Sequence, residues 1–495
     1  FFSYLPDENK KAIEKDWGKS PGEVMTAKQH MIIPGIINGN VFIGLQPRRG
    51  FIEDPAKIYH DPDLSPPWQY LGYYKWIRDE FKADAVMHIG KHGSLEWLPG
   101  KAIGLSENCY PDIAILDLPN IYPYIINNPS EGTCAKRRSY ACIIDHLIPV
   151  MNNADSYGHI AEIEVLLDDY YHIKTQDTKK MPHQQKAIWD KVIEAKLDTD
   201  LKVTQEQAFS NFDKFIENLH GYISEVKDTL IRDGLHILGR PPKDDSLIEM
   251  FTALTRLANG SIPSLRESIA KNLCLDYEDL LANRGKFNVV LHKSNAAIID
   301  EINAKIHEIL KEYEKTAFDP DTAPEIANNF FKGEVSAIQK VLVYIGDVLK
   351  LKLSLTEEEI DICLAALSGS FVPPGPSGAP TRGCADILPS GRNFYSIDPN
   401  AVPSRAAYKV GCKLADELLA RYVDEEGHFP GSIGMIIWGG GVMRTKGDDI
   451  AEIFSFLGVR PVWEDKSGRV TDIEVIPLEE LKRPRIDFTI REGGL

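Results

Sequence analysis

The spacing of apolar residues divides this chain into a middle that predicts helices and two ends that do not. Between about residues 155 and 365, hydrophobic side chains recur every three or four positions, the period of amphipathic helices. The longest runs are Phe212, Phe215, Ile216, Leu219, Ile223, Val226 and Leu230; Ile298, Ile302, Ile306, Ile309 and Leu310; and Ile338, Val341, Leu342, Ile345, Val348 and Leu349. We find no fixed-length repeat, which argues against a regular solenoid.

The part before this helical middle alternates short apolar runs with turn-forming residues. Residues 40–45 and 112–118 predict strands, as does the run that ends at His88, and an aromatic helix is expected to begin at Trp68. Such alternation is typical of α/β structure.

The part after the helical middle opens with residues 371–392, which are too rich in proline and glycine for a helix or a central strand. We interpret them as a functional loop. A helix over 406–421 and a buried strand over 434–438 follow. Three glycines then precede a helix for which Asp448 or Asp449 is the expected cap.

At 495 residues the chain is too long for one hydrophobic core. We predict a multidomain mixture of α/β and all-α structure. Residues 1–150 would form an α/β domain, 151–370 a mainly helical domain, and 371–495 a second α/β layer that closes a cleft. Since the chain does not begin with methionine, we expect it to be a piece of a longer protein.

Charge and composition exclude several classes of partner. Asp and Glu number 73 against 56 Lys and Arg, a net charge of -17, which disfavours nucleic acids and anionic membranes. No apolar run is long enough for a membrane span and none resembles a signal peptide, so we expect a cytoplasmic protein. Seven scattered cysteines without a C-x-x-C pair indicate neither a disulfide framework nor a thiolate zinc site.

The candidate site follows the strand-like run that ends at His88. His88, His92 and Glu96 surround two glycines, at the carboxyl end of an expected strand, where α/β folds bind ligands. These side chains suit proton transfer or metal binding. Two satisfied histidines and a surface glutamate are the alternative, but three such groups in one loop favour function.

Several basic residues are further candidates if they converge. Separately each could lie on the surface, but together they would bind a ligand with several carboxylates. They are Arg49, Lys136, Arg137, Arg138, Arg392 and Arg444. His236, near the end of an amphipathic helix, could point into a cleft or could only interact favourably with the helix terminus.

The chain has no recognisable nucleotide-binding loop. Gly93 and the Gly100-Lys101 pair are one residue too far apart for the G-x-x-x-x-G-K-[ST] pattern, and Ala102 follows. If the protein needs ATP, another chain hydrolyses it.

Four long motifs, in order, resemble the large subunits of the cobaltochelatase and magnesium chelatase family. They are His88–Lys101, residues 117–138, residues 391–399 and residues 438–449. The Glu96-Trp97-Leu98-Pro99 sequence looks like the cobalt branch. The resemblance covers nearly the whole chain. Because family members are much longer, it implies that this chain is their central part.

The resemblance implies a tetrapyrrole-binding catalytic subunit that inserts cobalt(II) into a corrin-ring precursor of the hydrogenobyrinic acid a,c-diamide type, in cobalamin biosynthesis. ATP and magnesium would be bound by separate small and medium AAA+ partner subunits. Three alternatives stay open. They are insertion of magnesium into protoporphyrin IX, a tetrapyrrole-binding scaffold without turnover, and a histidine-carboxylate metallohydrolase with tightly held zinc.

Within this family interpretation, we expect His88 and His92 to bind or relay the metal and Glu96 to accept a ring proton. The expected substrate-binding residues are Arg49, Lys136, Arg137, Arg138, His236, Arg392, Asn393, Tyr395 and Arg444. The aromatic residues expected to flank the flat ring are Trp97, Tyr395 and Trp438. The hypothesis requires the loop near residue 90 to share one cavity with guanidinium groups from beyond residue 380.

Overall fold

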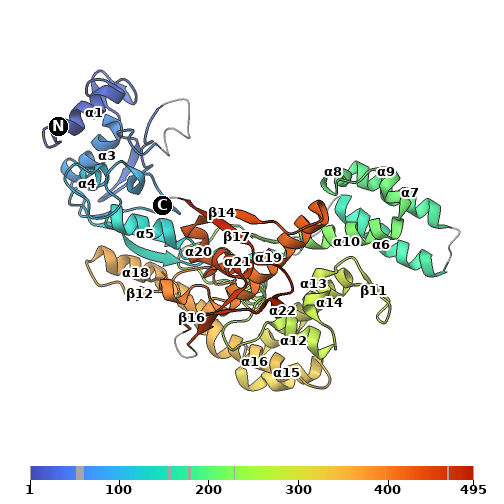
Figure 1. Ribbon diagram of the computed structural model, residues 1–495. Helices are drawn as coiled ribbons and strands as arrows, with labels where there is room; N and C mark the ends of the chain where they lie inside the picture. The colour runs from blue at the N-terminus through green and yellow to red at the C-terminus, as the bar shows by residue number, and fades with distance from the viewer. Residues whose placement is uncertain are drawn as a thin grey trace.

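Helices and small sheets build a mixed α/β and helical, multidomain fold, which confirms the predicted fold class (Figure 1). The computed structural model describes residues 2–51, 61–153, 159–176, 180–227, 229–232, 234–395, 397–464 and 468–493. Ser396, which falls in the 391–399 motif, lies outside these residues.

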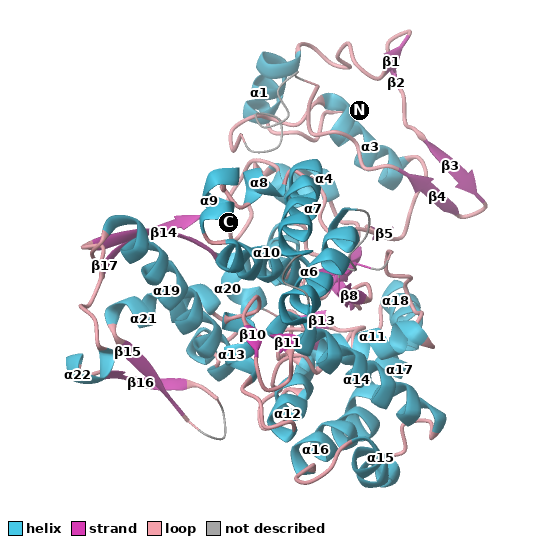
Figure 2. Ribbon diagram, turned by 90° about the vertical axis from the view of Figure 1, so that its right-hand side faces the viewer, coloured by secondary structure: helices cyan, strands magenta, loops and turns pink. Residues whose placement is uncertain are grey.

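The N-terminal part is organised around an aromatic helix, α3, Trp68–Asp79, whose side chains are mostly buried. Its neighbours are α1, Asp7–Trp17; β1, Thr26–Ala27; β2, His30–Met31; β3, Gly35–Asn38; and β4, Val41–Gly44. The antiparallel ribbon of β3 and β4 extends beside α3, as Figure 2 shows. The strand predicted over 40–45 and the helix predicted from Trp68 are both present.

A three-stranded parallel sheet lies next in the chain, with β6 in the centre. Its strands are β5, Val86–Met87; β6, Asn120–Ile125; and β7, Cys142–His146. The helix α5, Pro129–Arg138, packs close to Tyr124. The approach is so close that a Cβ atom at Gly132 would lie 3.3 Å from the Tyr124 ring. Ile121 points to the other face, where it packs with Cys363 of α18, Glu358–Leu367.

The prediction of a strand over 112–118 was wrong. Tyr110–Ile115 form a helix, α4, whose second residue is Pro111, a position where proline is favourable. The true strand, β6, contains Pro123, and a proline normally argues against a central strand. It is tolerated because β5 pairs only with Asn120 and Ile121, so no β5 hydrogen bond is required at Pro123.

The predicted helical middle is confirmed, and it contains two groups of helices. Figure 1 shows the first group as a green lobe that projects from the rest. Its helices are α6, His159–Gln176; α7, Met181–Glu194; α8, Leu197–Asp200; α9, Gln205–Ser210; and α10, Phe212–Lys227. The second group contains α11, Asp245–Leu254; α12, Leu265–Asn272; α13, Tyr277–Ala282; α14, Asn295–Lys315; α15, Ala323–Phe330; α16, Ser336–Tyr344; and α17, Lys350–Ser354.

Short strand pairs interrupt and follow these helices. β8, Met151–Asn153, pairs with β9, Leu230–Arg232, and β10, Phe287–Asn288, with β11, Lys293–Ser294. In the proline- and glycine-rich segment, β12, Pro374–Gly375, pairs in parallel with β13, Asn393–Phe394, which directly follows the segment.

The C-terminal layer contains long helices and two strand pairs. Its elements are α19, Arg405–Glu426; β14, Ser432–Trp438; α20, Gly439–Thr445; α21, Asp448–Leu457; β15, Val459–Trp463; β16, Val470–Val475; α22, Leu478–Leu481; and β17, Asp487–Gly493. The strand predicted over 434–438 is present but alternates between half-buried and exposed residues. Asp448 is the first residue of α21 and not its cap, which is Gly447 with a φ of 104°.

Contacts of α5 and β7 with the C-terminal half bring distant parts of the chain together. Lys136 donates hydrogen bonds to Asn393 Oδ1 at 2.8 Å and to the Phe394 carbonyl at 2.7 Å. The backbone N–H of Arg392 donates to Asp145 Oδ1 at 2.8 Å. The helices α5 and α20 are in contact (Figure 1). The first and last α/β parts therefore share an interface.

The hydrophobic cores do not follow the three predicted sequence ranges, and the ranges themselves stay a prediction. The largest cluster joins residues of β6 and β7 to helices α11–α17 and to Phe394. A separate cluster surrounds α3 and α4, and another fills the α6–α10 lobe. Among the described residues, no helix is long and apolar enough to cross a membrane.

Candidate active site

The loop after β5 brings His88, His92 and Glu96 to the edge of the parallel sheet. The His88 N–H donates to the Ile121 carbonyl at 2.9 Å, so this histidine continues the strand. Two glycines then allow the chain to turn, and a short 3₁₀ helix, η1, Leu95–Trp97, buries Glu96. The sequence prediction of a strand that leads into a loop is correct.

Both ring nitrogens of His88 contact protein partners. Nδ1 lies 2.7 Å from Asn120 Oδ1, and Nε2 lies 2.9 Å from the Tyr74 hydroxyl. The Asn120 amide nitrogen donates to the Ser139 carbonyl, which leaves Oδ1 as the acceptor and assigns the proton to Nδ1. Burial lowers the pKa of His88, so the ring is neutral at pH 7.

Glu96 is a buried carboxyl, with only 1% of its surface exposed. Burial raises its pKa, and the hydrogen bond from the Gly93 N–H at 3.0 Å opposes part of that effect. Tyr70, which hydrogen-bonds Ser94 at 2.9 Å, also lies near this carboxyl. A carboxylate with a raised pKa is a stronger base than one in water, so Glu96 is suited to accept a proton.

His92 is more accessible and contacts a second carboxylate, Glu131 of α5. His92 Nδ1 lies 3.4 Å from Glu131 Oε2, and the two side chains are 53% and 31% exposed. Asn128 Nδ2 donates to the same oxygen at 2.9 Å, and the Tyr124 hydroxyl lies 3.5 Å from it. An imidazole and a carboxylate thus meet between the loop and the first turn of α5.

A cavity of about 1010 Å³ lies beside this loop, between α5 and the C-terminal layer. One side contains Trp97 and the basic residues Arg49, Arg137 and Arg138, together with the acidic Asp61 and the apolar residues Leu98, Pro99 and Ile103. The other side is mainly apolar and contains Ile397, Pro399, Val402, Ile437, Val442, Met443 and Ile450. Ligand pockets usually measure ~300–1000 Å³, so this cavity suits a large ligand with both apolar and anionic parts.

The predicted site residues are only partly brought together. Arg49, Arg137, Arg138 and Trp97 line the cavity, and the chain beyond residue 380 supplies its apolar wall. Among the residues that the structure describes, the cavity lining includes none of the other predicted site residues: His88, His92, Glu96, Lys136, His236, Arg392, Asn393, Tyr395, Trp438 and Arg444. The guanidinium groups expected from beyond residue 380 therefore do not line it.

The five predicted residues beyond position 390 that do not line the cavity have different surroundings. Asn393 accepts a hydrogen bond from Lys136, and Arg392 joins β7 through its backbone. Arg444 is exposed and acts electrostatically on Asp449. Tyr395 and Trp438 are 52% and 59% exposed. Sequence alone cannot tell which basic residue on a helix or loop turns toward a cavity.

His236 lies away from the cavity lining, in a buried network with Glu359 of α18. Its Nε2 lies 3.0 Å from Glu359 Oε2, and its ring stacks on His146 with centroids 4.8 Å apart. Ser390 and the N–H groups of Leu147 and Gly239 also donate to Glu359. Burial alone would raise the pKa of Glu359, but these hydrogen bonds lower it overall.

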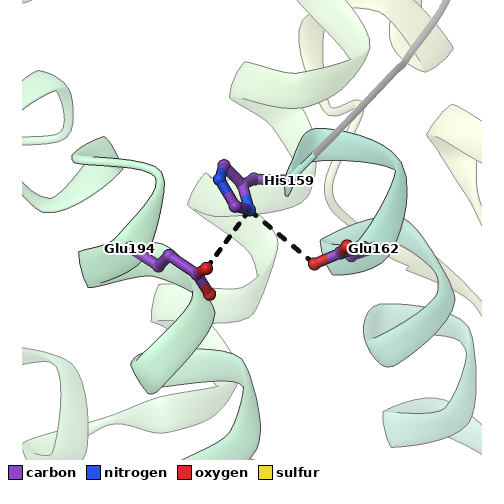
Figure 3. A group of neighbouring side chains, drawn as sticks. All are labelled: His159, Glu162 and Glu194. Atoms are coloured by element: carbon purple, nitrogen blue, oxygen red, sulfur yellow. Dashed lines mark ion pairs between the residues drawn. The ribbon is translucent and has the colours of Figure 1, made fainter.

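One further group of potential metal ligands lies in the helical lobe. Figure 3 shows His159 and Glu162 of α6 facing Glu194 at the end of α7, with His159 Nδ1 3.7 Å from each carboxylate. Lys191 contacts both carboxylates, at 2.5 and 2.8 Å. Because this ammonium bridges the two carboxylates and offsets one of their two charges, we interpret the group as an ion-pair network that joins α6 to α7.

Comparison with known proteins decides the family. A model of the family described as CobN/Magnesium Chelatase matches residues 1–495. The chain belongs to this family. The prediction made from the His88–Lys101 and later motifs is therefore confirmed.

Relatives occur in both branches of the CobN/magnesium chelatase family. The chain is 37% identical to the aerobic cobaltochelatase subunit CobN of Pseudomonas aeruginosa, with all of this chain and 40% of that protein covered. It is 33% identical to the magnesium-chelatase subunit ChlH of Oryza sativa subsp. japonica, with 98% and 36% covered.

The structure of the catalytic subunit of cobaltochelatase from Mycobacterium tuberculosis is also similar. It has a TM-score of 0.84 and 42% sequence identity, with 99% of this chain and 41% of that chain covered. The chain spans about 40% of the length of these cobaltochelatase relatives. The family fold thus extends over all the elements that position the site.

Several residues of the site were missed by the sequence analysis. Glu131 lies inside the 117–138 motif, so the resemblance could have drawn attention to it. For Asn120 and Tyr74, the hydrogen-bond partners of His88, nothing in the sequence indicated a role in the site. Their role depends on the register of β6 against β5 and on the packing of α3, which local sequence does not determine.

Proposed function

We propose that this chain carries the ring-binding and metal-inserting site of an ATP-dependent cobaltochelatase. The substrates would be cobalt(II) and a corrin-ring precursor of the hydrogenobyrinic acid a,c-diamide type. The observation that carries the proposal is the cavity of about 1010 Å³, which is lined by three arginines, by apolar residues and by Trp97, the residue that follows the buried Glu96. Relatives named as cobaltochelatase subunits support the choice of metal.

Recognition of the ring would divide between the two walls of the cavity. Arg49, Arg137 and Arg138 would bind the carboxylates at the edge of the macrocycle. Trp97 and the apolar residues of the C-terminal layer would contact its flat face. Arg49 is only 1% exposed, and burial lowers its pKa, so its interaction with a carboxylate would occur in a poorly solvated place.

Metal insertion requires the ring to lose a nitrogen-bound proton as the metal arrives. Glu96 is the proposed proton acceptor, because burial raises the pKa of its carboxyl and the Gly93 N–H holds it in place. His88 is proposed to stay neutral and to position the loop through Tyr74 and Asn120. A neutral imidazole there adds no positive charge to repel the metal.

The hydrolysis of ATP is proposed to occur on separate AAA+ subunits, because the sequence lacks a phosphate-binding loop. The full-length protein would work with those partners in the cytoplasm, which fits the lack of a membrane-spanning helix among the described residues.

Replacing Glu96 by glutamine tests the proposal. The full-length protein, its ATPase partners, ATP, cobalt(II) and the ring are mixed, and insertion is followed by the absorbance of the ring. We expect Glu96→Gln to reduce insertion at least about a hundredfold and to leave ring binding within about twofold. Glu107→Gln, at an exposed position, is the matched control. Insertion at a normal rate by Glu96→Gln would remove Glu96 as the proton acceptor.

A magnesium chelatase is the second candidate, because relatives named magnesium-chelatase subunits match 97–98% of this chain at 32–33% identity. Presenting each ring with each metal separates the two functions. A spectral shift on adding ring, without metal uptake when the partners are present, would instead support a scaffold without turnover.

A further inference from the structure

We propose that His92 and Glu131 form the pair of ligands that receives the divalent metal before it enters the ring. This inference rests on the proposed chelatase function and adds Glu131 to it. His92 Nδ1 and Glu131 Oε2 lie 3.4 Å apart, and their side chains are 53% and 31% exposed. A hydrated metal arriving from solvent can therefore reach both groups.

The separation of the two ligand atoms fits a metal ion between them. Bonds from zinc-like metals to histidine nitrogen and carboxylate oxygen measure ~2.0–2.2 Å. Two such ligands 3.4 Å apart would subtend an angle of about 110° at the metal, which is close to tetrahedral. The separation of the two atoms is therefore compatible with cobalt(II) or zinc(II) bound between them.

The carboxylate of this pair is held in position by its own neighbours. Asn128 Nδ2 donates to Glu131 Oε2 at 2.9 Å, and the Tyr124 hydroxyl lies 3.5 Å from that oxygen. Hydrogen bonds to a metal-binding carboxylate orient it and support metal affinity. Asn128 precedes α5 and Tyr124 belongs to β6, so the sheet and the helix together fix Glu131.

A site of two protein ligands suits a metal that must leave again. Three or four protein ligands would complete the coordination and hold the metal as a resident ion. Two ligands leave positions for water, which the ring nitrogens can replace. His88 is less suited to this task, because Asn120 and Tyr74 engage both its ring nitrogens.

The pair is also close to the place where the ring would bind. Glu131 follows Ser130, which lines the cavity, and Glu96 precedes Trp97, which lines it too. The Cys134 thiol lies 3.8 Å from the Glu96 carbonyl, so α5 and the Glu96 loop are in contact. The group of His159, Glu162 and Glu194 lies instead in the helical lobe, and Lys191 contacts both of its carboxylates.

In the transfer step, the metal exchanges its bonds to His92 and Glu131 for bonds to ring nitrogens. When a ring N–H bond breaks, its electron pair stays on nitrogen and forms the bond to the metal. The proton moves to the Glu96 carboxylate. His92 and Glu131 return to their contact and can receive the next ion.

The test compares the KM for cobalt(II) with the KM for the ring in the full-length protein with its ATPase partners. We expect His92→Ala and Glu131→Gln to raise the KM for cobalt(II) about tenfold or more and to change the KM for the ring less than about twofold. His30→Ala and Glu107→Gln, at exposed positions elsewhere, are matched controls. An unchanged KM for cobalt(II) in both variants, or an equal change in both KM values, would overturn the proposal.

A change of ligand chemistry provides a second readout that a structural role would not affect. Thiolate is softer than imidazole and favours softer metals. We therefore expect His92→Cys to shift the insertion preference from cobalt(II) toward cadmium(II), by about tenfold relative to the unmodified protein. The same metal preference in His92→Cys and the unmodified protein would contradict direct contact.

These results can be separated from a failure of the proposed function. If Glu96→Gln inserts metal normally, the proton acceptor is wrong, but the KM comparison still decides the role of His92 and Glu131. If Glu96→Gln is inactive while both KM values stay normal in the other variants, the function stands and this inference fails.

Discussion

The His92–Glu131 and His236–Glu359 pairs contain the same two kinds of side chain but differ in burial. The first, beside α5, is 53% and 31% exposed, with a separation of 3.4 Å. The second, beside α18, is 8% and 0% exposed, with a separation of 3.0 Å. Three further donors complete the hydrogen bonds of Glu359. The buried pair therefore holds segments of the chain together, while the exposed pair is available to a ligand.

Breaking the buried pair should have the largest effect on stability. Glu359→Gln removes the charge that His236 and three other donors stabilise, and loss of one partner of a buried pair costs about 3 kcal/mol. Urea denaturation followed by circular dichroism measures the free energy of unfolding. Glu358→Gln, at the exposed neighbouring position, should change it by less than about 0.5 kcal/mol. Equal stability of the two variants would show that the buried pair has no structural role.

A buried histidine elsewhere should make stability depend on pH. Burial lowers the pKa of His220, on α10, from 6.5 to about 4. Below pH 6.5 the unfolded state gains a proton that the folded state does not bind, so the free energy of unfolding falls, by about 2 kcal/mol at pH 5. The loss of stability levels off as the pH falls below about 4, the pKa of His220 in the folded state.

This pH effect is measured by urea denaturation at pH 7 and pH 5. His220→Gln should lose less stability on acidification than the unmodified protein, and His183→Gln, at an exposed position on α7, should lose as much. The same acid sensitivity in His220→Gln would mean that His220 is protonated in the folded state.

Breaking the exposed pair should have the smallest effect on stability. Glu131→Gln removes a contact that is partly solvated, and such pairs contribute at most about 1 kcal/mol. The free energy of unfolding at pH 7 should therefore stay within about 1 kcal/mol of that of the unmodified protein. A loss of stability as large as that expected for Glu359→Gln would show that the exposed pair contributes as much to folding as the buried pair.

The helical middle and the loop that follows β5 could be predicted from the sequence alone. The hydrophobic period determines the helices locally, and two glycines determine the loop. It failed at 112–118, where a helix with Pro111 in its first turn occupies residues 110–115 and the strand follows, with an unexpected proline at position 123. Which element occupies the centre of a sheet depends on pairing with residues far away in sequence.

The site was predictable in its residue types but not in its contacts. His88, His92 and Glu96 lie in one loop and could be identified together. The convergence of Arg49 and Arg137 on one cavity, and the hydrogen bond from the Arg392 backbone to Asp145 of β7, depend on how α5 and β7 pack against the C-terminal part of the chain. Such packing joins residues more than 200 positions apart, as the bond from Lys136 to Asn393 shows.

The central claim, that the ring binds in the cavity between α5 and the C-terminal layer, is tested most directly by titrating a corrin-ring diamide into the full-length protein and following absorbance. Ala102 lines the cavity and is exposed, so Ala102→Trp should fill space needed by the ring without unfolding the protein. We predict ring binding at least about tenfold weaker than in the unmodified protein, and unchanged binding in Ala420→Trp, an exposed position on α19. Equal ring affinity in the two variants would contradict the account.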